Sequence, residues 1–396
     1  MTTQTEILLP PRLSVGPVAW LKKNLFSTWY NAVLTILAVL LIGTPLRSAL
    51  AWATTDARWG AITSNLTLFM VGQYPRDQLW RIWLAIYLLA ALIGLSWGHW
   101  RSAVRGFAII ALGAAAVFAL TAIQSDVWLN WLTVIIILGV SYLGGRRIPQ
   151  TRRATIVAWV IYFPASIFLL AGSPAVPGVP PVELSLWGGL LLTLTITVVG
   201  NLIALPLGIL LALGRRSRLP AVHYFCVGYI ELIRGVPLIT ILYMAANMLP
   251  FFLPEGVRPD NVIRALIGFS LFEAAYQAEN VRGGLQAIPR GQYEAAAALG
   301  FNTTLSTALI ILPQALRIVI PALLGSFISL FKDTSLVAII GLFDVLRVGR
   351  SVLAQEDWLG THREVFLFAF LIYWGFNMAF SYGSRRLEQA TGVGKR

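Results

Sequence analysis

The sequence has few charged residues, one cysteine and three histidines. Charged side chains make up 12% of the 396 residues and hydrophobic ones 57%, whereas a typical soluble domain has about 25% charged residues. The single cysteine, Cys226, excludes an internal disulfide, and its apolar surroundings favour a small buried side chain. His99, His223 and His362 are far apart in the chain, so we expect no metal site.

Two functional motifs are also absent. The N-terminal region contains LLPPRL and no small-residue cleavage site before the first long apolar run, so we expect no signal peptide. No segment fits the phosphate-binding pattern Gly-x4-Gly-Lys-Ser/Thr, and the C-terminal GVGKR lacks both the spacing and a following helix. We therefore expect this chain to have no catalytic residues, to bind no cofactor and not to be an enzyme.

The net charge of +13 does not come from a continuous basic face. The arginines stand in short clusters between apolar runs, as in GGRRIPQTRR (144–153), GRRSR (214–218) and SRRLEQ (384–389). Such clusters are typical of the charges that orient membrane helices. We therefore do not expect binding to nucleic acid.

Long apolar runs predict an all-α integral membrane protein with about ten transmembrane helices. Several stretches of about 18 or more residues carry no charge, which is the length that a helix needs to cross the hydrocarbon layer. The 14 tryptophans suit the membrane interfaces. The predicted spans are 28–46, 80–98, 106–124, 127–144, 154–172, 186–213, 222–250, 261–281, 305–331 and 364–384.

The apolar runs fall into two groups of about five helices. The segment GSPAVPGVPPVELS separates them, and its four prolines exclude a continuous helix. The expected domains are a cytoplasmic segment 1–27, accessory helices 28–172, a proline-rich periplasmic linker 173–185 and a second group 186–390. If the linker is a true boundary, deletion of 1–172 should spare the second group.

The distribution of basic residues predicts the orientation. If residue 1 is cytoplasmic and every span crosses, most of the 30 Lys and Arg fall in the inside segments, as the positive-inside rule requires. This orientation places both termini and residues 282–304 in the cytoplasm. The protein is then multi-pass, with membrane lipid around its helices.

The segment QYEAAAALGFNTTLSTALIILPQ (292–314) predicts a short cytoplasmic helix between two spans. Pro289 and Gly291 are expected to set a turn, and Glu294 would fall in the first helical turn, where a carboxylate is favourable. The alanines give helix propensity with little bulk, and Gly300 would end the helix. Such a short helix with small side chains suits docking in a groove of a partner protein.

This segment resembles the signature of bacterial ATP-binding-cassette (ABC) importer permeases. The helix that follows, capped by Asn302 or Thr303, would cross the membrane. In that family the short coupling helix fits a cleft on the cytoplasmic ATPase and transmits its motion. The matching positions, with the turn before them, are Pro289, Gly291, Glu294, Ala295, Ala296, Gly300, Ile310, Leu312 and Pro313.

Three further stretches look like permeases for polar amino acids. They are ELIRGVPLITILY (231–243), AAYQAENVRGGLQAIPRGQYEAA (274–296) and FKDTSL (331–336). The resemblance covers about 186–390 and implies a five-helix type I importer permease core. The extra N-terminal helices look like the longer of the paired subunits in general L-amino-acid importers. Packing against lipid and contact with the binding protein are both open as their role.

The resemblance also implies partners and a mechanism. The partners are a second homologous permease, a cytoplasmic ATPase dimer that holds ATP and magnesium, and a periplasmic amino-acid-binding protein. Polar L-amino acids would enter through a bacterial inner membrane by alternating access, driven by the ATPase. The alternative is an ion-coupled secondary transporter, which predicts inverted repeats with matching broken helices. A membrane-embedded transferase would instead need clustered His, Asp or Glu.

Polar residues inside the predicted spans are candidates for substrate contact. A charge inside a span costs about 2.5–3.5 kcal/mol, so it should face a cavity or a partner. Asp333 could accept from the substrate ammonium group, and Lys332 or Thr334 could donate to its carboxylate. A helix-end cap with an interfacial lysine is the alternative. The candidates are Lys332, Asp333, Thr334 and Ser335, with Glu273, Gln277 and Arg234 in addition.

Spacing predicts two ion pairs in the second group of helices. Glu231 and Arg234 are three residues apart and share a helix face, and so do Glu279 and Arg282. Structural ion pairs near a membrane face and residues of the substrate path are both open for them. Arg317 is expected to pair with a carboxylate that the sequence does not identify.

Other stretches are expected to depart from straight helices. Pro237 removes a backbone hydrogen bond, so the span 222–250 should break there, either to bind a zwitterion through exposed backbone dipoles or for packing alone. Residues 332–364 begin with the apolar run SLVAIIGLFDVL and predict a re-entrant or cavity-capping segment. Pro313 and Pro321 are expected to kink their span.

Overall fold

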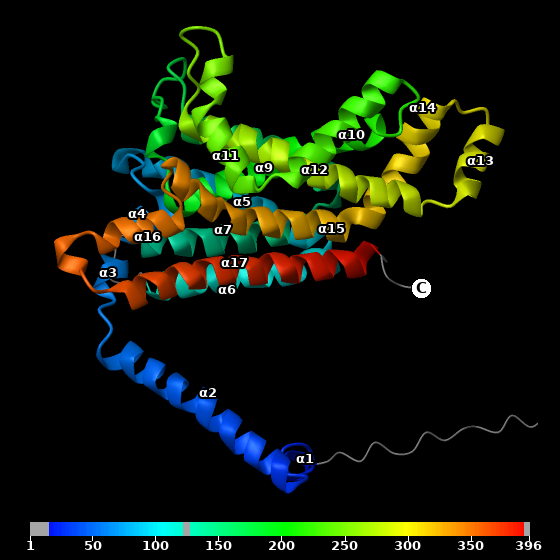
Figure 1. Cartoon of the computed structure of the whole chain (residues 1–396). Helices are drawn as coiled ribbons and strands as arrows, with labels where there is room; N and C mark the ends of the chain where they lie inside the picture. Colours follow the sequence, from blue (N-terminus) through cyan, green and yellow to red (C-terminus); the bar gives the residue numbers. More distant parts are fainter. Residues whose placement is uncertain (1–15, 122–126, 392–396) are drawn as a thin grey trace, which may run out of the picture. The chain divides into compact units, whose positions relative to one another are not determined.

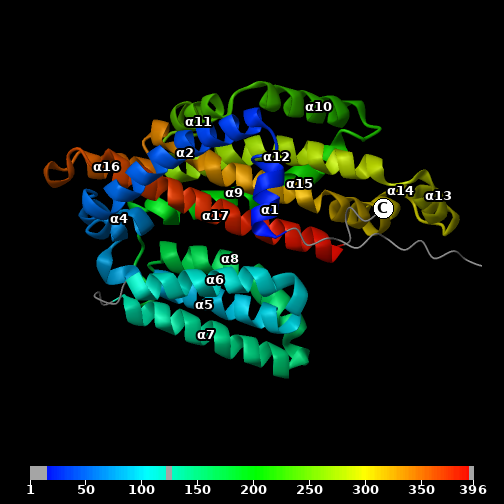
Figure 2. The same cartoon turned by 90° about the horizontal axis from the view of Figure 1, so that it is seen from below.

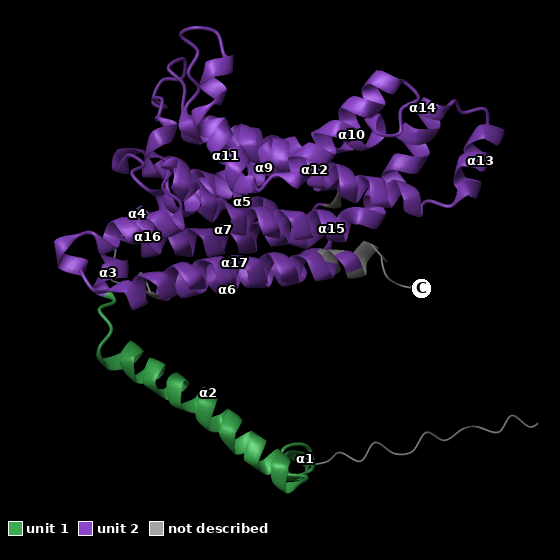
Figure 3. Cartoon of the chain, in the orientation of Figure 1, with its two compact units in different colours: residues 1–59 green, residues 60–396 purple. Residues whose placement is uncertain are grey.

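Helices make up the regular structure of the protein (Figure 1; Figure 2). The computed structural model describes residues 16–121 and 127–391, and within them it contains helices and two isolated bridges but no strand. The predicted all-α fold is therefore confirmed. The chain divides into two compact units, residues 1–59 and residues 60–396 (Figure 3).

The first unit contains one long apolar helix. Its described part begins with α1 (Pro17–Asn24), and α2 (Trp29–Thr55) follows. Thr28 begins α2 by accepting a hydrogen bond from the backbone N–H of Asn31 (3.4 Å). None of the residues of α2 is buried, and the helix is long and apolar enough to cross a membrane. It is longer than the predicted span 28–46, because the chain stays helical beyond Pro45.

The second unit begins with short helices and continues with four long ones that pack closely. Gly98 faces the carbonyl oxygen of Tyr142, and an ideal Cβ at Gly98 would lie 2.6 Å from it; Gly145 faces the carbonyl oxygen of Leu95 in the same way. Small residues thus let α5 and α7 approach backbone to backbone. The elements are α3 (Gly60–Thr63), α4 (Leu66–Val71), η1 (Arg76–Gln78), α5 (Leu79–His99), α6 (Arg101–Thr121), α7 (Trp128–Arg147), η2 (Pro149–Thr151) and α8 (Arg152–Ala171).

The predicted linker has no helix between Ala171 and η3 (Leu184–Leu186). It is held against the preceding helices by hydrogen bonds. The Arg81 guanidinium of α5 donates to the carbonyl of Pro180 (2.8 Å), and the N–H of Val182 donates to the carbonyl of Ala171 at the end of α8 (2.8 Å). The Tyr74 hydroxyl donates to the carbonyl of Leu170 of α8 (2.8 Å). The linker is therefore folded onto the start of α5.

The remaining helices form the core around α9 and α12. Gly208 of α9 faces Gln277 of α12, where an ideal Cβ would lie 2.6 Å from the Gln277 Cβ. Phe269 is fully buried between these helices and α15. The elements are α9 (Gly189–Gly214), α10 (Pro220–Gly235), α11 (Leu238–Asn247), η4 (Leu249–Phe252), α12 (Asn261–Ala287), α13 (Arg290–Ala298), α14 (Thr303–Ser306), η5 (Thr307–Ile311), α15 (Leu312–Asp333), η6 (Thr334–Ile340), α16 (Val345–Leu353), η7 (Glu356–Trp358) and α17 (His362–Thr391).

The predicted break at Pro237 is confirmed and is larger than a kink. α10 and α11 meet at an angle of 104°. Pro237 has φ −58° and ψ 138°, an extended conformation that ends the helical run and begins the next one. Within the described residues, this is the one pair of apolar helices that bends so sharply at a short break.

Residues 334–361 contain the helices η6, α16 and η7 and are therefore not a plain loop. Asp344 begins α16 by accepting hydrogen bonds from the backbone N–H groups of Leu346 and Arg347 (3.0 Å each), and the Tyr373 hydroxyl of α17 donates to it (3.1 Å). The valines of α16 are buried against α17. The expectation of a re-entrant or cavity-capping segment stays a prediction.

Helices occupy the described residues of all ten predicted spans, and residues 122–124 of the span 106–124 lie outside the described residues. Not all of the spans meet the length and hydropathy criteria for crossing a membrane. Seven are long and apolar enough to cross a membrane, and the bent pair α10–α11 would be an eighth. The apolar part of α6, Val104–Leu120, is shorter, and α12 carries a row of polar residues. The count of about ten crossings stays a prediction.

The short helices α3 and α4 pack into the same cluster as α16 and α17. Phe69 is 0% exposed and lies edge-to-face on Phe368, with 5.1 Å between ring centroids. Gly72 forms a bridge with Trp187 at the start of the second group. Deletion of 1–172 would remove these contacts, so we no longer expect it to spare the second group.

Replacement of Phe69 by alanine tests this packing. We expect F69A to cost about 3–5 kcal/mol of unfolding free energy, because it leaves a cavity against α16 and α17. L66A is the matched control, since Leu66 is on the same helix but 37% exposed. The measurement is the melting temperature of each variant in detergent. Equal shifts for the two variants would contradict a core role for α4.

Candidate coupling helix and substrate path

α13 projects from one end of the second unit, away from the packed helices (Figure 1). Pro289 precedes it with φ −59° and ψ 142°, and the helix begins at Arg290. Gly291 is thus inside the helix rather than in a turn, and Glu294 lies in the second turn rather than the first. Both predicted positions are wrong, because Pro289 alone sets the entry angle and the helix begins directly after it.

The end of α13 follows the sequence prediction. Gly300 has φ +81°, which other residues rarely adopt. Its N–H donates to the carbonyl of Ala297 (2.9 Å), and the N–H of Phe301 donates to that of Ala296 (3.1 Å). This pair of bonds is a Schellman motif. Asn302 then begins α14 by accepting from the N–H of Leu305 (2.8 Å), so the predicted cap is confirmed at Asn302.

The two faces of α13 differ. Ala296 is 1% exposed and faces the protein's own helices, whereas Leu299 is 75% exposed. Glu294 and Ala295 are also exposed. The face that is available to a partner therefore consists of one carboxylate, small alanines and one leucine, and Ala296 supports this face from behind.

One tyrosine ties α13 to the rest of the protein. The Tyr293 hydroxyl donates to the carbonyl of Leu285 in α12 (3.2 Å) and accepts from the guanidinium of Arg216 (3.2 Å). Arg216 follows the end of α9 and also lies over the Tyr293 ring, 5.7 Å from its centroid. On the other side, Gln314 of α15 donates to Gln292 (3.1 Å).

Beside this tether, Glu279 of α12 is the centre of an ionic cluster that we call the Glu279 cluster. Its carboxylate lies 2.8 Å from the guanidinium of Arg215, 2.7 Å from that of Arg282 and 3.6 Å from that of Arg234. The side chain of Glu279 is 17% exposed. Arg234 also lies over the ring of Tyr276, 5.4 Å from its centroid.

The structure confirms one predicted ion pair and corrects the other. Glu279 and Arg282 pair as expected. Glu231 pairs with Arg215 (3.1 Å) instead of Arg234. Arg234 turns toward Glu279 because that carboxylate lies across the α10–α12 contact and is less exposed. Arg317 is exposed on α15 and forms no ion pair within the described part of the chain.

The remaining motif residues lie where α14 joins α15. A π-helical turn, η5, precedes Leu312, and Pro313 is in the first turn of α15. Pro313 lacks an N–H, so it cannot complete a regular bond to the turn before it, and a widened turn relieves the clash there. The π-helical turn stands where a kink was expected at Pro313. Pro321 lies inside α15, which continues as one helix on both sides of it.

Three of the substrate candidates come together between α12 and α15. Glu273 and Gln277 are buried, and the Gln277 amide donates to the Glu273 carboxylate (3.0 Å). Asp333 of α15 is close enough to interact electrostatically with Glu273. Ser326 of α15 forms a hydrogen bond with the Glu273 carboxyl group. The Gln277 side-chain oxygen is buried without a partner. A buried polar strip therefore faces α15.

The other candidates are placed differently. Thr334 is fully buried, and its hydroxyl donates to the carbonyl of Phe331 (2.7 Å), so it is closed to a substrate in this conformation. Lys332 is exposed and Ser335 is half-buried. Arg234 belongs to the Glu279 cluster, outside the Glu273 strip.

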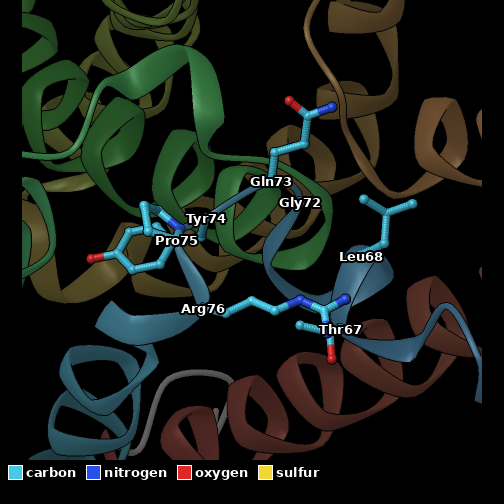
Figure 4. Close-up of a pocket in the computed structure, with 7 residues that line it drawn as sticks. All are labelled: Thr67, Leu68, Gly72, Gln73, Tyr74, Pro75 and Arg76. Carbon is cyan, nitrogen blue, oxygen red and sulfur yellow. The ribbon is translucent and has the colours of Figure 1, made fainter.

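A pocket of about 280 Å³ lies apart from all of these residues (Figure 4). It is lined by residues 67–68 and 72–76, between α4 and η1. Tyr74 lines it but is itself tied to Leu170 and packs against Trp187. None of the substrate candidates lines this pocket.

The sequence alone did not reveal the residues that connect α13 to the other helices. Arg215 and Arg216 were interpreted only as orientation charges in GRRSR, and Tyr293 was given no role. Asn280 was also missed, although it donates to Ser326 beside Glu273 (3.1 Å). A signal was present for Asn280, because it follows Glu273 and Gln277 at helical spacing. The partners of Arg215 and Tyr293 are too distant in the chain for spacing to reveal.

Comparisons with known proteins identify the family of the chain. The family model "Binding-protein-dependent transport system inner membrane component" matches residues 204–393. The chain is 40% identical to the inner membrane amino-acid ABC transporter permease protein YhdY of Escherichia coli (strain K12), over 99% of each chain. It is 37% identical to the glutamate/glutamine/aspartate/asparagine transport system permease protein BztC of Rhodobacter capsulatus, over 98% of this chain and 97% of that protein.

A solved structure is also similar to part of the chain. It is described as the crystal structure of an amino acid ABC transporter with histidines. It is 29% identical, covers 49% of this chain and 90% of its own, and has a TM-score of 0.43. From its similarity to full-length relatives over nearly all of both chains, we conclude that this protein belongs to the family of amino-acid ABC transporter permeases, the inner membrane components of binding-protein-dependent transport systems.

Proposed function

We propose that this permease imports polar L-amino acids by alternating access, driven by ATP hydrolysis on a separate subunit. The observation that carries the proposal is α13, an exposed helix with small side chains that is tethered to the core by Tyr293. The amino acids in the name of the Rhodobacter capsulatus relative support a polar substrate. The permease provides the path and the lever, and the ATPase provides the chemistry.

The partners follow from this division of labour. A periplasmic binding protein delivers the amino acid to the outer face, and a second permease completes the cavity. Two ATPase subunits bind ATP and magnesium and hold α13 through the exposed Glu294, Ala295 and Leu299. When they close, the two permeases rock and the cavity opens outward; hydrolysis returns it to the inward-open state.

The Glu279 cluster would carry the motion of α13 into the helices. Tyr293 is bonded to Arg216, and the neighbouring Arg215 is bonded to Glu279. Glu279 holds Arg234, which stands just before the 104° break at Pro237. A shift of α13 therefore reaches the broken helix through polar contacts, whose cost of rupture is higher than that of apolar contacts in a low-dielectric region.

The buried strip of Glu273 and Gln277 is our proposed contact for the substrate, with Asp333 and its neighbours Lys332, Thr334 and Ser335 at the border. Carboxylates suit the ammonium group of an amino acid, and the unpaired oxygen of Gln277 is a further acceptor. Thr334 would become available only in another state of the transport cycle, because its hydroxyl is now bonded within the chain.

We place both termini and α13 on the cytoplasmic side of a bacterial inner membrane. The basic ends of α7 and α8 and the C-terminal part of α17 lie at the same end of the second unit as α13 (Figure 1). A basic end of this kind favours the cytoplasmic side.

Reversal of the charge at Glu294 tests the docking face. We expect E294K to reduce amino-acid uptake at least tenfold while the protein still inserts, because the ATPase groove would meet a cation in place of a carboxylate. The measurement is uptake and ATPase activity of the complex in vesicles. E183K is the control, since Glu183 is an exposed carboxylate in the linker. Normal uptake by E294K would exclude this role.

Neutralisation of Glu279 tests the proposed lever. We expect E279Q to lower the unfolding free energy by roughly 1.5–3 kcal/mol, because three guanidinium groups would lose their shared carboxylate. Uptake per ATP hydrolysed should fall as well. E231Q is the matched control, because Glu231 is 57% exposed and has one arginine partner. If both variants transport with the same uptake per ATP, the cluster is structural only.

Neutralisation of the substrate strip tests the path. We expect E273Q and D333N each to raise the KM for uptake by about tenfold or more, since a charge-assisted hydrogen bond contributes roughly 1.5–3 kcal/mol. The measurement is uptake of a panel of labelled amino acids by the whole complex. D357N, at an exposed site in η7, is the control. An unchanged KM and substrate profile would remove the altered residue from the path.

A further inference from the structure

A group of exposed arginines stands at the junction of α7 and α8. Arg146 and Arg147 end α7, and Arg152 and Arg153 begin α8. We call these four residues the basic patch. All four are exposed, and none is in an ion pair within the described part of the chain. The amino-acid transport proposed above gives them no role.

The patch is fixed in place by contacts with the neighbouring loop. The ring nitrogen Nε2 of His99 lies 3.2 Å from the Thr151 hydroxyl, and the guanidinium of Arg152 lies over the Trp100 ring at 5.3 Å from its centroid. On the same side, Trp97 packs against Tyr142 with 4.4 Å between ring centroids. Arg152 is thus held against Trp100, beside a pair of packed aromatic rings.

The local electrostatics are unfavourable without a bound anion. Arg152 and Arg153 occupy the first turn of α8, where the helix dipole already places partial positive charge. Thr151 precedes the helix, but its hydroxyl donates to the carbonyl of Ile148 (2.8 Å) and does not cap the helix. Between residues 79 and 182 the sequence has one acidic residue, Asp126. No described residue of this segment carries a carboxylate that could offset the patch.

The surroundings of the patch identify the anion as a lipid headgroup. Exposed apolar side chains begin within a turn of the arginines, namely Leu143 on α7 and Ile156 and Val157 on α8. Both helices are long and apolar enough to cross a membrane. Clustered arginines and tryptophans at such a boundary lie at the depth of phospholipid phosphates. A soluble anion would not need the apolar surface below them.

We propose that the basic patch binds the phosphate headgroup of an anionic phospholipid, such as phosphatidylglycerol, in the leaflet on the side of α13. The acyl chains then lie along the exposed apolar faces of α7 and α8. This gives the accessory helices a function of their own, which is to hold an anionic lipid beside the permease core.

The test uses the full-length chain in nanodiscs that contain phosphatidylcholine and a trace of spin-labelled lipid. We expect the wild type to immobilise labelled phosphatidylglycerol with about tenfold preference over labelled phosphatidylcholine. The variant R146Q/R147Q/R152Q/R153Q should lose most of this preference. The matched control R218Q/R317Q/R385Q/R386Q removes the same number of exposed arginines and should keep it.

Three outcomes of the comparison between variants would overturn the proposal, and a fourth comes from competition with phosphate. They are a wild type with no preference for phosphatidylglycerol, a patch variant that keeps the preference, and a control that loses it equally. Millimolar inorganic phosphate is added in a separate arm. Full displacement of the labelled lipid by phosphate would assign the patch to a free anion instead. The melting temperature of each variant in detergent shows that the variants compared are folded.

Discussion

The contact on which the candidate machinery depends is the carboxylate of Glu279 within its ring of arginines. A carboxylate at 17% exposure between apolar helices is stable only where cations surround it. The three arginines come from the end of α9, from α10 and from α12, so one group fixes the relative positions of three helices. The α9–α10 turn that supplies Arg215 also supplies Arg216, which holds Tyr293. The position of α13 and the position of the broken helix α10–α11 are therefore set together.

Much of the fold could be predicted because its signals are local. A proline forces a break at its own position, as at Pro237, and a glycine with a following asparagine ends one helix and begins the next, as at Gly300 and Asn302. The helix-free linker follows from four prolines in the same way. These features need only the chemistry of a few neighbouring residues, which the sequence contains in full.

The rest could not be predicted, because it depends on partners that are distant in the chain. Spacing indicates that Glu231 and Arg234 share a helix face, but Arg234 lies closer to a carboxylate on another helix. Arg215 and Glu279 are 64 residues apart. The placement of α4 beneath α16 and α17 likewise has no local signal, since Phe69 looks like any interfacial phenylalanine. The motif around Glu294 could be recognised from its letters, yet only packing decides that Ala296 faces inward.

The conformation of Gly300 has a consequence for the shape of the projection formed by α13 and α14. At φ +81° the chain turns sharply between α13 and α14, although an ideal Cβ there would meet no other atom within 4 Å. The constraint is thus purely one of backbone torsion, and no neighbour enforces it. A side chain with a Cβ is strained at this φ, so most substitutions at Gly300 would disfavour the turn. The bend between α13 and α14 therefore depends on the absence of a Cβ atom at Gly300.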